Sequence, residues 1–120
     1  MKKMLFLLLM VICFACTEAE RFHTATAQIV VESFYQKDFP VLEKHTTKDS
    51  YYSFMYIQDI VPKVDNRDSH FKVIQETENE DTARVQFSTI YEEQPETFKL
   101  KKEEGSWKVT EIEMGEKVPF

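Results

Sequence analysis

Glycine is almost absent from this chain of 120 residues, which contains only Gly105 and Gly115. A phosphate-binding loop or a dinucleotide fingerprint needs several closely spaced glycines, because the backbone must approach the phosphate groups. The sequence therefore excludes both kinds of nucleotide site. It also lacks internal repeats and any linker rich in serine, glycine or proline, so its length is that of one domain.

Cysteine is equally scarce: Cys13 and Cys16 are the only two, and both lie near the N-terminus. A chain cleaved before Cys16 has no second thiol with which to form an internal disulfide. Small secreted domains often depend on such bridges. We therefore expect this domain to be held together by an ordinary hydrophobic core.

Closely spaced metal ligands are missing as well. The three histidines, His23, His45 and His70, are separated by 22 and 25 residues, whereas zinc ligands usually occur in closely spaced pairs. We predict no metal site and no cofactor. We expect His45, near the end of a predicted helix, to be a surface or capping residue.

The chain has no excess of positive charge, because 15 basic residues face 21 acidic ones, a formal charge of −6. Loss of Lys2 and Lys3 with an N-terminal leader would leave 13 against 21, a formal charge of −8. A nucleic-acid ligand requires a basic face, so we predict no nucleic-acid partner. The acidity either solvates the surface or complements a basic protein partner.

The chain also lacks an apolar run long enough to cross a membrane. The run of residues 4–15 has 12 residues, whereas a membrane-spanning helix needs about 20. Two lysines before it and a small residue, Ala15, at its end are typical of a secretory signal. We expect residues 1–15 to be a signal peptide that is cleaved, followed by a domain over residues 24–120.

The segment Cys13-Phe14-Ala15-Cys16 resembles the lipobox of bacterial lipoproteins. The resemblance implies that Cys16 carries acyl chains such as palmitate and that residues 16–23 are the lipidated cysteine and its tether. Two or more acyl chains anchor a protein stably, so we expect membrane attachment in the bacterial cell envelope. Thr17 after the cysteine favours the outer membrane. An ordinary secretory signal that contains two cysteines is the alternative.

The first half of the domain is predicted to be helical. Ala27, Val30, Val31 and Phe34 follow the spacing of one helix face, and Thr24 or Thr26 could cap its start. Asp38 before Phe39 and Pro40 predicts a second helix to about His45. Thr47 or Asp49 is expected to cap a third helix, which ends before Pro62.

The second half is predicted to form four strands. Apolar and polar residues alternate over residues 71–76 and 83–91, and we expect a turn over residues 92–96 around Pro95. Glu104-Gly105 predicts a tight hairpin between the last two strands. A change of phase before Ile112 indicates a bulge. The predicted fold is α+β: N-terminal helices packed on a curved antiparallel sheet of about four strands.

This order of elements resembles the nuclear-transport-factor-2-like (cystatin-like) superfamily. A closer resemblance is to small Bacteroidetes lipoproteins that contain a domain of unknown function, family 4878. It is carried by the segments Phe34–Phe39 and Asp81–Val85 and by the hairpin Phe98–Val109. The resemblance implies a curved sheet wrapped around a helix, often with a pocket between them, and it assigns no chemistry.

Aromatic residues are the most distinctive candidates for a binding site. We predict that Tyr35, Tyr56, Tyr91 and Trp107 could line a pocket for a flat apolar ligand, with the hydroxyl groups as polar contacts. Plain filling of the core is the alternative explanation. Adjacent Tyr51 and Tyr52 cannot both face inward from one helix, so one of them is expected to be exposed.

No catalytic motif is present, and we predict no catalytic residue. We therefore expect a lipid-anchored, non-catalytic binding or scaffold domain. One alternative is a protein with a pocket for a small apolar ligand, including an isomerase-like enzyme, and the aromatic residues motivate it. Another is an inhibitor or immunity protein that binds a basic enzyme, and the acidity of the chain motivates it.

Overall fold

The computed structural model describes residues 22–64 and 68–114 of the chain. The predicted leader, Cys16 and most of the tether lie outside the described residues. Three helices come first: α2 (His23–Tyr35), α3 (Phe39–Lys44) and α4 (Lys48–Ile57), the last continued by a short 3-10 helix, η1 (Gln58–Ile60). Four strands follow: β1 (Lys72–Glu78), β2 (Thr82–Thr89), β3 (Glu92–Glu103) and β4 (Ser106–Met114).

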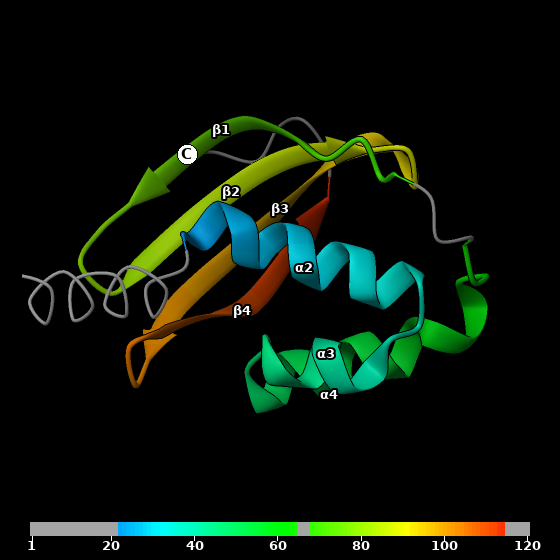
Figure 1. The fold of residues 1–120 in the computed structure, drawn as a ribbon, viewed down its shortest axis with the longest axis horizontal. Helices are drawn as coiled ribbons and strands as arrows, with labels where there is room; N and C mark the ends of the chain where they lie inside the picture. Colours follow the sequence, from blue (N-terminus) through cyan, green and yellow to red (C-terminus); the bar gives the residue numbers. More distant parts are fainter. Residues whose placement is uncertain (1–21, 65–67, 115–120) are drawn as a thin grey trace, which may run out of the picture.

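The strands form one antiparallel sheet in the order β1-β2-β3-β4. The sheet is curved, α2 crosses one of its faces, and α3 and α4 lie below α2 beside β4 (Figure 1). Backbone hydrogen bonds join the α3–α4 connection to β4, because Thr47 N donates to Val109 O and Val109 N donates to His45 O. The predicted α+β fold with helices on one face of the sheet is confirmed.

The predicted apolar face of α2 is confirmed. Ala27, Val30, Val31 and Phe34 are all buried, and they pack in one core with the inward side chains of the sheet. Those inward side chains alternate along the strands, as a sheet with one covered face requires. They include Val85, Phe87, Phe98, Leu100, Trp107 and Val109.

The predicted cap of α2 is wrong. The helix begins at His23 after Phe22, and no side chain caps it. Thr26 is buried inside the first turn, and its backbone N–H donates to Phe22 O. The ring nitrogens of His23 lie 3.2 and 2.9 Å from carboxylate oxygens of Glu76 and Glu78 on β1. The start of the helix therefore lies beside β1, and neither threonine caps it.

The caps predicted for the other helices are confirmed in position. Asp38 precedes α3, with Pro40 in its first turn, although the Asp38 side chain makes no capping hydrogen bond. His45 follows α3, and its Nδ1 lies 2.9 Å from the Val41 carbonyl oxygen of the last turn. Thr47 Oγ1 accepts a hydrogen bond from Ser50 N at 3.4 Å at the start of α4.

The predicted turn around Pro95 is wrong, because β3 already runs from Glu92 through Pro95. Thr89 pairs with Glu92 and Phe87 pairs with Glu96, so residues 93–95 lie opposite Ser88 alone. Proline has no N–H for the ladder, and a bulge of this kind is one of the few places where a strand accepts it. The chain reverses earlier, at Ile90 and Tyr91.

The hairpin and the bulge of the last two strands are confirmed. Glu104 and Gly105 have φ angles of 52° and 81°, the left-handed pair that a two-residue hairpin turn requires. Leu100 pairs with Val109, but the neighbouring Lys99 pairs with Glu111, so Thr110 is the extra residue. The bulge restores Ile112 to the inward face opposite Phe98.

Candidate functional site

The structure brings together only two of the four residues predicted to line a pocket. The rings of Tyr35 and Tyr91 stack with their centres 4.4 Å apart. Tyr56 is 90% exposed on α4. Trp107 is the second residue of β4, beside the β3–β4 hairpin, whereas Tyr91 precedes the other end of β3. The four aromatic residues therefore do not share one pocket.

Two glutamates of β3 join the stacked tyrosines. The Tyr35 hydroxyl donates a hydrogen bond of 2.9 Å to Glu92 Oε1, and Gln36 Nε2 donates one of 3.5 Å to the Tyr91 hydroxyl. Glu96 lies four residues further along β3. We call Tyr35, Tyr91, Glu92 and Glu96 the Glu96 cluster.

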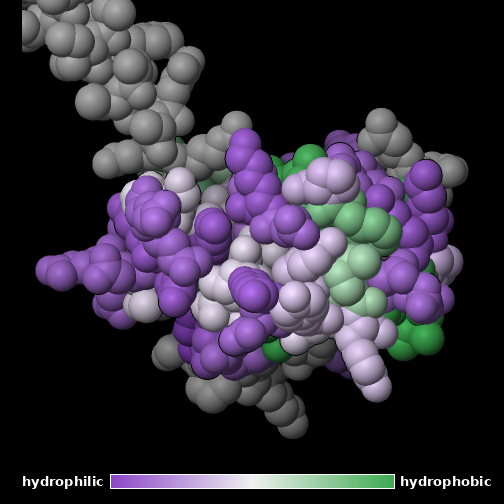
Figure 2. All heavy atoms as spheres, turned by 90° about the horizontal axis from the view of Figure 1, so that it is seen from below, coloured by the Kyte–Doolittle hydropathy of each residue, from purple (hydrophilic) through white to green (hydrophobic). Residues whose placement is uncertain are grey.

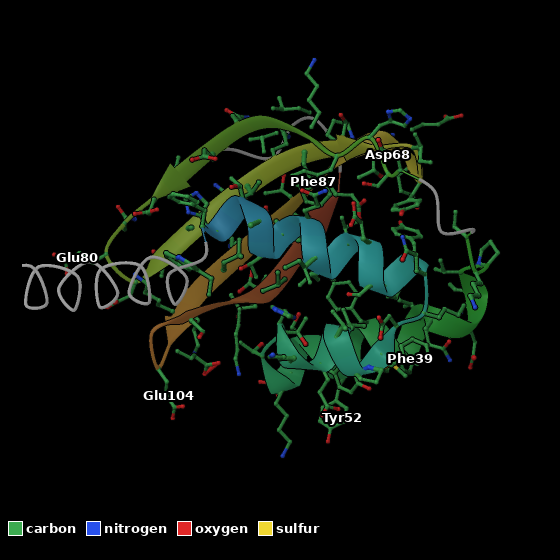
Figure 3. All side chains as sticks on the ribbon, in the orientation of Figure 1. Phe39, Tyr52, Asp68, Glu80, Phe87 and Glu104 are labelled. Atoms are coloured by element: carbon green, nitrogen blue, oxygen red, sulfur yellow. The ribbon has the colours of Figure 1, made fainter. Side chains whose placement is uncertain are left out.

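The strand register points Glu96 inward. It pairs with Phe87, and residues that pair directly across antiparallel strands lie on the same face of the sheet. Phe87 is fully buried and projects from the sheet toward α2 (Figure 3). Only 6% of Glu96 is exposed, and its Oε2 has no hydrogen-bond partner among the described residues. An ionisable carboxyl group thus lies at the end of the apolar core.

The electrostatics of the cluster follow from this burial. Burial, and then the nearby charge of Glu92, raises the pKa of Glu96 to about 7. Burial also raises the pKa of Tyr35, and Glu96 and Glu92 add to the effect. Tyr35 therefore keeps its proton and remains a hydrogen-bond donor, while Glu96 can gain or lose a proton near neutral pH. A buried group with a perturbed pKa is a candidate functional group.

Sequence reasoning missed both glutamates because it assigned them to a turn. One signal was available. Phe98 and Leu100 alternate with Lys99 and Lys101, which marks one side of the strand as apolar, and counting back by two residues from Phe98 reaches Glu96.

A second candidate is a surface hollow of about 420 Å³ at the hairpin end. Its lining residues are Lys44, His45, Glu103, Glu104, Ser106, Trp107 and Lys108. The Trp107 ring, however, is buried against the edge of His23, with centres 5.6 Å apart, and the Lys102 ammonium lies 5.3 Å from its centre. His23 and Lys102 therefore already contact the Trp107 ring, and the residues that line the hollow carry charges of both signs. The hollow offers less defined chemistry than the Glu96 cluster.

A third candidate is an apolar surface on α4 and η1. Tyr52, Tyr56, Ile57 and Ile60 are all exposed there, and we call this surface the α4 face. Tyr52 points away from the sheet (Figure 3). Seen from the helix side, pale and green side chains gather at the α4 and η1 end, and strongly hydrophilic ones cover the hairpin end (Figure 2). Tyr51 is half-buried beside Tyr52, so the prediction that one of the two is exposed is confirmed.

Within residues 22–64 and 68–114, no helix is long and apolar enough to cross a membrane, and no group of three potential metal ligands comes together. A scan against models of known protein families, a search of curated proteins and a search of solved structures each gave no match.

Proposed function

We propose that the chain is a lipid-anchored protein of the bacterial cell envelope whose domain binds a basic partner protein and catalyses no reaction. In this proposal Cys16 carries the lipid, and the partner docks on the α4 face. The observation that carries the proposal is the exposure of Tyr52, Tyr56, Ile57 and Ile60 on the consecutive elements α4 and η1. Contiguous exposed apolar side chains mark interaction sites, and tyrosine is enriched in protein interfaces.

The net negative charge of the domain favours a basic protein as the partner that binds the α4 face. The formal charge after cleavage before Cys16 is −8, so two copies of the domain, or the domain and an anionic bilayer, repel each other. Charges near the face balance locally, because Lys48 and Lys63 accompany Asp49 and Asp59, all four exposed. The apolar contacts therefore supply the affinity, and the net charge steers a basic partner during the encounter.

The anchor is tested by metabolic labelling of the bacterium with an alkyne analogue of palmitate. The wild-type protein is expected to take up the label and to fractionate with membranes. The Cys16→Ala variant is expected to do neither, while Cys13→Ala still does both. Label that persists in Cys16→Ala, or a wild-type protein without label, overturns the anchor.

Docking is tested by site-specific photo-crosslinking in cells. A benzoylphenylalanine placed at Tyr56 is expected to capture one basic protein, whereas the same group at Glu80, in the β1–β2 turn, captures none. The Tyr52→Ser/Ile60→Ser double variant is expected to abolish capture from Tyr56 without unfolding the domain. A dimer of the chain, lipid alone or an unchanged pattern in the double variant would each contradict a basic protein on this face.

A further inference from the structure

The Glu96 cluster lies outside the α4 face and has no role in the docking proposed for it. Its two carboxyl groups form no ion pair with any basic side chain in the described part of the chain. The nearest lysine in sequence after α2, Lys37, donates hydrogen bonds to the backbone and side-chain oxygens of Gln58 on η1. Lys37 therefore makes its hydrogen bonds with η1 and none with the cluster.

We propose that the Glu96 cluster binds a small organic cation, a primary or quaternary ammonium group, between its two carboxylates and its stacked tyrosine rings. This inference goes beyond the docking of a protein partner and does not depend on it.

The first argument for a cation is that a buried carboxyl oxygen of Glu96 lacks a partner among the described residues. A buried charge without a partner is strongly disfavoured, and Glu96 Oε2 makes no hydrogen bond with the described residues although the side chain is only 6% exposed. Without a ligand, the carboxyl group avoids the penalty by keeping its proton at higher pH than usual. A bound ammonium group would supply the missing partner and favour the ionised form.

The second argument is the aromatic wall of the cluster. Tyr35 and Tyr91 stack at 4.4 Å with an angle of 26° between the rings, and ring faces attract a cation by their quadrupole. The Tyr35 hydroxyl is held by Glu92, which fixes the ring. Tyr91 is half-buried and Glu92 is exposed, so the cluster reaches the solvent at these two side chains.

The test is calorimetric titration of the full-length protein in detergent with tetramethylammonium and with butylammonium. Butanol and sodium chloride at equal ionic strength are the controls for apolar contact and for bulk salt. Both cations are expected to bind saturably, and neither control is expected to do so. Absence of saturable binding by both cations overturns the proposal.

Two variants locate the binding. Glu96→Gln keeps the volume of the side chain and is expected to weaken tetramethylammonium binding by about tenfold. Its matched control is Glu93→Gln, an exposed residue of the same strand that loses the same formal charge. Equal effects of the two variants would reduce the binding to general charge attraction and contradict the site.

Tyr91→Leu tests the ring independently, because both carboxyl groups remain. It is expected to weaken tetramethylammonium binding by about threefold. The affinity of wild-type protein for this cation, which does not titrate, is also expected to rise between pH 6 and pH 8 as Glu96 ionises. Since Tyr35 and Glu92 face Glu96 and Tyr91 stacks on Tyr35, the same rise must be absent in Glu96→Gln. A flat profile in the wild type would contradict the role of Glu96 even if Glu96→Gln fails to fold.

Discussion

The two ends of β3 differ in how completely their side chains are satisfied. At the hairpin end, Gly105 supplies the turn, and Trp107 is enclosed by His23 and Lys102. At the other end, β3 opens with a bulge at Pro95 and directs Glu96 into the core, where one of its oxygens has no hydrogen-bond partner among the residues that the structure describes. The turn and the contacts of Trp107 satisfy the first, closed end, whereas the second, open end keeps an ionisable group where apolar packing would be more stable. This difference is the reason why the cation proposed above is placed at the second end.

The largest effect is expected from Trp107→Ala at the closed end. The side chain is buried in the core, and removal of a buried tryptophan costs about 3 to 5 kcal/mol. Chemical denaturation should show this loss in the free energy of unfolding. Tyr56→Ala, on an exposed aromatic side chain, is the control and should change it by less than about 0.5 kcal/mol. Similar losses in both variants would contradict the enclosure of Trp107.

The next effect is expected from Glu96→Gln at the open end, and it depends on pH. The folded pKa of Glu96, about 7, exceeds the ordinary 4.5. The folded state therefore holds the proton more tightly, and this stabilisation is fully present below pH 4.5 and lost as the pH rises through 7. Between these limits the wild type should lose on the order of 3 kcal/mol relative to Glu96→Gln.

Urea denaturation of both proteins at several pH values measures this difference. The comparison of the two proteins cancels the contribution of other acids. One of these is Glu113, whose pKa is lowered by Arg84 and Lys99 despite partial burial. If the difference in the free energy of unfolding between wild type and Glu96→Gln stays constant across pH 5 to 8, the pKa of Glu96 is not raised in the folded state. The contrast between the two ends of β3 would then be lost.

Gly105→Ala tests the closed end through the backbone alone. The φ angle of Gly105 is 81°, and no atom lies within 4 Å of the position that a Cβ would take. The cost is therefore conformational, about 1 to 2 kcal/mol for a residue other than glycine in the left-handed region. Thermal or chemical unfolding should show it, with Ser106→Ala, the exposed next residue, as the control. An unchanged stability would mean that the turn relaxes to another type.

The elements that the sequence predicts well are those fixed by neighbouring residues. The face of α2, the cap at Thr47, the turn at Glu104 and Gly105, and the bulge at Thr110 each follow from spacing or from one residue's conformational preference. Four antiparallel strands after a helical half could therefore be predicted without knowledge of long-range contacts.

The elements that the sequence predicts poorly depend on partners far along the chain. His23 in the first turn of α2 lies next to Glu76 and Glu78 of β1, and no local pattern contains that information. Of the candidate site, Tyr35 and Tyr91 were among the predicted residues, but Glu92 and Glu96 were not. Proline suggested a turn at Pro95, and only the pairing of Phe87 with Glu96 shows that the strand continues.

The smallest effect is expected from Pro95→Ala, which asks what holds the bulge at the open end. Replacement of proline frees the unfolded chain and costs about 0.4 to 1 kcal/mol. The bulge itself should persist, because Phe98 and Leu100 must stay inward and alternation then keeps Glu96 on their face. Pro95→Ala should therefore keep the pH dependence of wild-type stability, measured by urea denaturation at pH 6 and pH 8. If that dependence disappears, Pro95 rather than the core register turns Glu96 inward, and the open end is fixed by local chemistry as much as the hairpin is.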